Sequence, residues 1–73
     1  MNHYVVKFFD LNDTSICAMF NQLVWGFAVK QYVVQRVDIT TLKIIAECSN
    51  EDIANEIMES IPGCEKVTGY LEF

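Results

Sequence analysis

No charged residue occurs between Asp13 and Lys30, and this stretch constrains the fold more than any other part of the chain. Ile16, Phe20 and Leu23 recur in it at the spacing that places side chains on one face of an α-helix. Polar residues interrupt its apolar character, and it is shorter than the roughly 20 apolar residues that a membrane-spanning helix needs. We therefore predict a helix that covers one face of a sheet with its apolar stripe.

Capping signals define both ends of this helix. Residues 12–15 (NDTS) can accept hydrogen bonds from the unpaired amides of a first turn, and Gly26 suits the left-handed residue that follows many helices. Ala18, Gln22 and Trp25 lie on the far side of the helix, away from the apolar stripe. Either they contact another protein, or Trp25 folds over the end of the helix and completes the core.

The remainder of the chain alternates between strand and helix patterns. Period-two alternation and a high content of β-branched and aromatic residues predict four strands, which cover residues 4–9, 27 or 29 to 37, 42–48 and 64–73. Residues 49–52 (SNED) combine a helix cap with acids in a first turn, and Pro62-Gly63 ends the helix that follows. The predicted order of elements is βαββαβ.

Two right-handed crossovers in this order place both helices on one face of a four-stranded antiparallel sheet. The arrangement is the ferredoxin-like plait, an α+β fold, which we predict for residues 1–73 as a single domain. The opposite, outer face of the sheet is predicted to carry Val5, Lys7, Phe9 and Ile45, together with Tyr32 or Val34. This mixed face is one that another molecule would cover.

Composition and charge exclude several classes of partner. The net charge is −5, the isoelectric point is near 4.5, and the five basic residues are spread evenly along the chain. Nucleic acids and membrane surfaces attract clustered basic residues, so we expect neither as a partner. The three cysteines lack CxxC spacing, and there is one histidine. They indicate reduced thiols in a cytoplasmic protein rather than a metal site.

The sequence lacks the residues that known functions of ferredoxin-like folds require. The first loop, DLNDTSIC, has neither the paired cysteines of a metallochaperone nor the basic phosphate cradle of an acylphosphatase. The third strand has no aromatic residue on which an RNA base would stack. Asp10 stands where the small endonucleases of CRISPR adaptation place a metal-binding aspartate, although it also suits the start of a turn. We predict no enzymatic activity, no cofactor and no metal.

The layout resembles that of ACT domains, small ligand-sensing modules of amino-acid metabolic enzymes. The resemblance covers nearly the whole chain: a strand ending at Asp10, a helix, a hairpin, a second helix, and Ile61–Val67 (IPGCEKV), which is similar to the LPGV-type start of their last strand. ACT domains usually have a glycine turn after the aspartate, where this chain has LND. The resemblance implies a small-molecule site at Asp10, Asn12 and Asp13.

The sequence favours a non-enzymatic, protein-binding module. Its predicted interface consists of Ala18, Gln22 and Trp25 with Tyr32, because tryptophan and tyrosine often carry binding energy. We expect a homodimer, since small domains gain stability by oligomerising. Such a module would act as an adaptor, inhibitor or regulatory subunit, as accessory proteins of viruses and mobile elements do. The alternative is an ACT-like sensor of a small molecule such as an amino acid.

Charge defines one further surface. Asp52, Glu56 and Glu59 recur at helical spacing on the exposed side of the second predicted helix. This acidic face is either an ordinary solvated helix surface or an imitation of a nucleic-acid backbone that blocks a DNA-binding protein.

Overall fold

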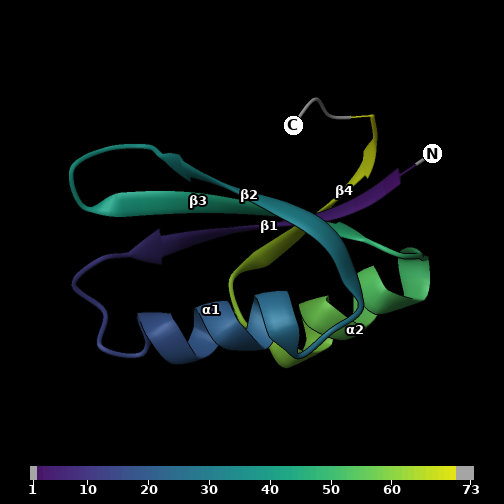
Figure 1. The fold of residues 1–73 in the computed structure, drawn as a ribbon, viewed down its shortest axis with the longest axis horizontal. Helices are drawn as coiled ribbons and strands as arrows, with labels where there is room; N and C mark the ends of the chain where they lie inside the picture. Colours follow the sequence, from purple (N-terminus) through teal and green to yellow (C-terminus); the bar gives the residue numbers. More distant parts are fainter. Residues whose placement is uncertain (1, 71–73) are drawn as a thin grey trace.

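The computed structural model describes residues 2–70 and has the predicted βαββαβ order. Its elements are β1 (Asn2–Asp10), α1 (Ile16–Trp25), β2 (Val29–Arg36), β3 (Thr41–Cys48), α2 (Glu51–Ser60) and β4 (Cys64–Gly69). The strands pair antiparallel in the order β2-β3-β1-β4. Figure 1 shows both helices on the same side of this sheet. The ferredoxin-like prediction is confirmed; the last part of the predicted fourth strand, residues 71–73, lies outside the described residues.

The main core lies between the sheet and the helices. Nine side chains, each at most 4% exposed, form it: Val5, Phe9, Leu23, Ile44, Ala46, Cys48, Ala54, Ile57 and Ile61. Leu23 is the only one of them that α1 contributes, whereas α2 and the residue that caps it contribute three. The two helices therefore cover the sheet unequally, and α2 packs more completely.

The prediction for the outer face of β1 is wrong. Val5 and Phe9 belong to the core between the sheet and the helices, where they pair with Ala46 and Leu42 of β3. The pattern could not decide this, because β1 is apolar on both faces and alternation alone does not say which face meets the helices. The outer face carries a second apolar cluster instead: buried Tyr4, Val6 and Ile45 with Val33 and Val67 packed against them. Ile45 was placed correctly.

Lys7 also lies on the helix side of the sheet and not on the outer face, and it is only 8% exposed. Its ammonium group donates a hydrogen bond to the carbonyl of Pro62 at 2.8 Å, just beyond the end of α2. A cation is favourable at that end of a helix because unpaired carbonyls gather there. Gly63 follows with a φ of +79°, and a Cβ on it would lie 3.1 Å from the Lys7 Nζ. The lysine thus ties the end of α2 to β1.

A β-bulge explains why the faces of β2 also differ from the prediction. Val29 pairs with Cys48 and Gln31 with Glu47, so Lys30 is an extra residue in the ladder. The bulge reverses the alternation after it. Consequently Val29 and Tyr32 both face the helices, where strict alternation would have separated them, and neither Tyr32 nor Val34 lies on the outer face.

The helix ends differ in their capping. The Asn50 side chain accepts a hydrogen bond from the amide of Ile53 at 3.0 Å, as the predicted cap of α2 requires. Ser15 is the N-cap residue of α1, but its side chain makes no capping hydrogen bond. Gly26 is not left-handed as predicted, since its φ is −82°. Glycine fits there for a steric reason: a Cβ would lie 2.6 Å from the carbonyl oxygen of Gln22.

Candidate functional site

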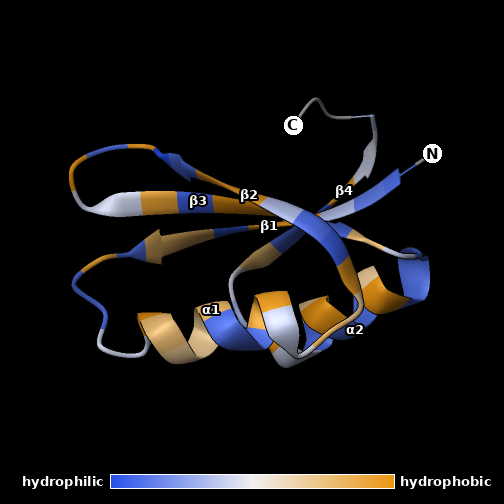
Figure 2. Ribbon diagram, viewed as in Figure 1, coloured by the Kyte–Doolittle hydropathy of each residue, from blue (hydrophilic) through white to orange (hydrophobic). Residues whose placement is uncertain are grey.

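The exposed side of α1 carries the three residues that the sequence placed there. Ala18, Gln22 and Trp25 are all exposed, and Trp25 is 75% exposed. The indole therefore does not complete the core, and contact with another protein stays a prediction for this side of α1. No charged side chain lies on α1, so this surface is polar only at its amides. Figure 2 shows the hydrophilic residues in the middle of α1 between apolar ends.

Tyr32, the fourth predicted interface residue, lies on β2 beside α1. Its ring packs edge-on against Phe20 of α1, with the ring centroids 5.7 Å apart. It remains 40% exposed. The contact joins the edge strand of the sheet to α1, which is why these two elements form one half of the molecule.

Most of the exposed large apolar side chains lie on α1, on β2 or in the connections next to them. Nine large apolar side chains in residues 2–70 are more than a third exposed, and six of them lie between the end of β1 and the start of β3: Leu11, Trp25, Tyr32, Val34, Val37 and Ile39. Sequence reasoning missed three of these: Leu11, Val37 and Ile39. Val37 and Ile39 carried a usable signal, because apolar residues flanking Asp38 in a hairpin connection have no core to enter.

A pocket of about 330 Å³ opens between α1 and the sheet. Its walls are apolar and come from β1, β3, the first turn and α1: Phe9, Leu42, Ile44, Leu11, Ile16 and Phe20. Cys17 and Asn21 also line it and are exposed, so they stand at its mouth. Sequence patterns did not indicate the pocket, because it results from the distance between α1 and the sheet and not from any residue type.

The turn after β1 engages the residues that the ACT resemblance implied. The Asp10 carboxylate accepts a hydrogen bond from the Asn12 amide at 2.8 Å, and the Asp13 carboxylate accepts two from Ser15, at 2.9 Å from its amide and 2.7 Å from its hydroxyl. The hydrogen bond from the Ser15 backbone lowers the pKa of Asp13, and that from the Ser15 side chain lowers it further. These carboxylates shape the turn, and a ligand role for them stays a prediction.

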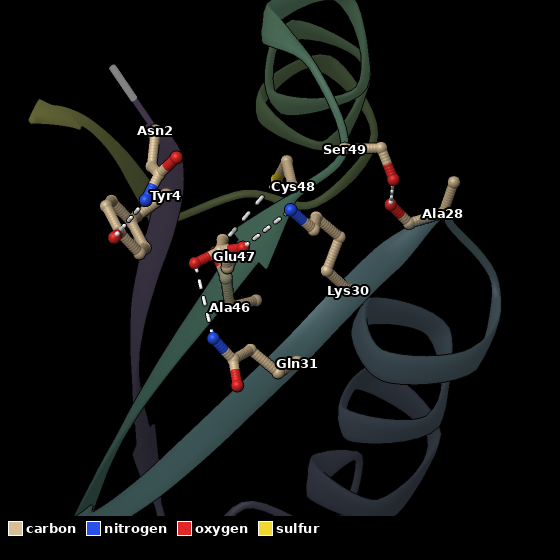
Figure 3. Close-up of polar contacts among 9 residues, drawn as sticks. All are labelled: Asn2, Tyr4, Ala28, Lys30, Gln31, Ala46, Glu47, Cys48 and Ser49. Atoms are coloured by element: carbon tan, nitrogen blue, oxygen red, sulfur yellow. Dashed lines mark hydrogen bonds and ion pairs between the residues drawn. The ribbon is translucent and has the colours of Figure 1, made fainter. Parts of the chain in front are cut away.

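Two further sets of charged groups lie on α2 and on the strands β2 and β3. Asp52, Glu56 and Glu59 are exposed on α2, as predicted. Glu47 of β3 is 6% exposed and is held by Lys30, with its oxygen 3.3 Å from the Nζ, and by the Gln31 amide at 3.3 Å (Figure 3). In residues 2–70, no three His, Cys, Asp or Glu side chains gather in a way that could hold a metal ion.

The three cysteines differ in environment and form no disulfide. Cys17 is exposed at the mouth of the pocket. Burial, together with the smaller effect of the nearby Glu47 charge, raises the pKa of Cys48 to about 11. Burial also raises the pKa of Cys64, and Lys7 opposes that shift. Cys17 is therefore the accessible thiol of the described chain.

Within residues 2–70, no helix is long and apolar enough to cross a membrane. The chain was compared with protein-family models, with curated proteins and with solved structures, and none of the three comparisons found a match. The βαββαβ layout that it shares with ACT domains is present, and it defines a fold class only.

Proposed function

We propose that this chain is a non-enzymatic protein-binding module that acts through the half of the molecule formed by α1 and β2. The observation that carries the proposal is the exposure of large apolar side chains on these two elements: Trp25 is 75%, Tyr32 40% and Val34 42% exposed. Soluble domains rarely leave such surfaces to water unless another molecule covers them. The predicted interface residues Ala18, Gln22, Trp25 and Tyr32 all belong to this half.

The position of β2 supports the same proposal. It is an edge strand of the sheet, and its Tyr32 and Val34 are 40% and 42% exposed. An edge strand offers unpaired amides and carbonyls to another chain, and proteins usually blunt it with charge or proline. Lys30 lies at the bulge near one end of β2 and Arg36 at the other, so the middle of the edge remains apolar.

The test is affinity capture from cells that produce this chain, with the wild-type protein and Trp25→Ala and Tyr32→Ala variants as bait. We expect both variants to lose captured proteins that the wild type retains, while their circular dichroism stays native. Met58→Ala is the matched control, because Met58 is an exposed apolar residue (37%) on α2. Equal capture by the wild type and the Trp25/Tyr32 double variant would contradict the proposal.

A further inference from the structure

The pocket beside α1 has the size and chemistry to take a ring. Its volume of about 330 Å³ is roughly twice that of an engineered apolar cavity of about 150 Å³ that binds benzene. None of the side chains that line it is charged. A zwitterion or a phosphate would find no counter-charge in it, whereas an uncharged aromatic side chain would bury its surface against Phe9, Phe20 and Leu42.

The same helix carries such a ring on its surface. Cys17, Asn21 and Trp25 are spaced by four residues, so they form one ridge along α1. The first two stand at the mouth of the pocket, and Trp25 lies one turn beyond, exposed. One face of one helix therefore combines an aromatic knob at its C-terminal end with a hole at its N-terminal end.

We propose that the partner is a second copy of this chain, and that two α1 helices pair antiparallel about a two-fold axis near Asn21. This inference rests on the proposed function and names its partner. In such a pair Trp25 lies opposite Cys17 and Ala18 of the other copy, since all are about four residues from the axis. Each indole then enters the other copy's pocket, and the large Trp25 side chain packs against the small side chains of Cys17 and Ala18. Each pocket is complete only when the second copy is present.

Charge favours this pairing over other contacts between two copies. Each chain carries −5, so most surfaces of two copies repel. The exposed face of α1 has no charge, whereas α2 would bring Asp52, Glu56 and Glu59 against their counterparts. At the axis, the side-chain amides of Asn21 and Gln22 both donate and accept hydrogen bonds, so each can pair with its own copy.

The buried area sets the expected strength. Two tryptophans bury roughly 300–500 Å² together, which is well below the roughly 1,200–2,000 Å² of a stable standard interface. The rest must come from short helices of 10 residues each. We therefore expect a reversible dimer with a dissociation constant in the micromolar range.

Sedimentation equilibrium over a range of concentrations tests the dimer, with wild type, Trp25→Ala and Tyr70→Ala. We expect wild type and Tyr70→Ala to dimerise alike, and Trp25→Ala to dissociate at least about tenfold more readily. Tyr70 is the matched control, because it is a 78% exposed aromatic residue that follows β4, away from α1 and β2. A wild type that stays monomeric at high micromolar concentration, or a Trp25→Ala variant that dimerises like wild type, overturns it.

Cross-linking tests the position of the axis and keeps the proposal testable if Trp25→Ala misfolds. In a Cys17→Ser background, Asn21→Cys is expected to form a disulfide between two copies under mild oxidation. Glu59→Cys, on the exposed side of α2, is the control and is expected to remain largely uncross-linked. Equal cross-linking of the two variants overturns the proposed axis.

The outcome separates this inference from the proposed function. If the wild type is monomeric and Trp25→Ala still loses captured proteins, the partner is another protein and the second copy is excluded. If Trp25→Ala changes neither self-association nor capture, both proposals fail. If it lowers self-association and, among the captured proteins, loses only copies of this chain, the second copy is the partner.

Discussion

The two helices cover the same sheet face but are built differently. α2 has a side-chain N-cap from Asn50, two acids in its first turn, and fully buried Ala54 and Ile57. α1 has no side-chain cap and no acid in its first turn, its buried residues are Leu23 and Val24, and a pocket remains between it and the sheet. Stability is thus concentrated under α2. The α1 half keeps apolar surface that folding does not use, and binding can use it.

The largest expected difference between the halves is the cost of removing a core side chain. Ile57 is fully buried, so Ile57→Ala should lower the free energy of unfolding by about 2–5 kcal/mol. Phe20→Ala removes more atoms but from a partly buried residue beside the pocket, and should cost about 1–2 kcal/mol. Urea unfolding followed by circular dichroism measures both. A larger loss for Phe20→Ala would mean that α1 is as closely packed as α2.

Thiol reactivity should differ by about a hundredfold or more. Cys17 is exposed, whereas burial raises the pKa of Cys48 from 9.0 to about 11, which lowers its thiolate fraction about a hundredfold at pH 8. Alkylation of dilute native protein, followed by mass spectrometry, should modify Cys17 first. Cys17→Ser should remove the fast phase. Fast modification of Cys48 would show that the core opens readily.

The raised pKa of Cys48 also makes the stability of the fold depend on pH. Burial of the neutral Cys48 thiol stabilises the fold in full below pH 9.0, and this contribution is lost as pH rises toward about 11, because the unfolded thiol ionises first. Cys48→Ala should flatten the fall in stability over that range. Urea unfolding at several pH values between 8 and 11 measures this, and an equal fall for the wild type and Cys48→Ala would contradict it.

Adding volume should distinguish the halves with a smaller effect. Ile57→Phe has no space under α2 and should destabilise by about 1–3 kcal/mol. Leu42→Phe points a ring into the pocket and should be tolerated or stabilise by about 0.5 kcal/mol. Melting temperatures of the two variants and wild type measure this. Equal destabilisation would show that the pocket is not open to a ring from inside.

Capping should give the smallest effect. Asn50→Ala removes the hydrogen bond to the Ile53 amide and should cost about 1 kcal/mol. Ser15→Ala removes a hydroxyl that donates to Asp13 but caps no amide of α1, so its cost should be about 0.3 kcal/mol. Chemical unfolding of both variants and of the wild type measures the two losses in the free energy of unfolding. A larger loss at Ser15 would show that the turn after β1 holds α1 in place.

Local sequence patterns predicted most of the fold. The order of elements, the cap at Asn50 and the exposed side of α1 all follow from periodicity and end signals that act over one or two turns. The same patterns did not predict which side chains of β1 and β2 face the helices. β1 is apolar on both sides, and the bulge at Lys30 reverses β2 in a way that only its pairing with β3 reveals.

The candidate site divides in the same way. Trp25 was recognisable on the sequence because a charge-free helix with one apolar stripe leaves its opposite side to solvent. The pocket was not recognisable on the sequence. It depends on the distance between α1 and Phe9, Leu42 and Ile44, which lie in other segments of the chain. The sequence by itself determined the elements and which side of α1 is exposed. Tertiary structure alone decided where space remains beside that surface, because packing depends on contacts between distant segments.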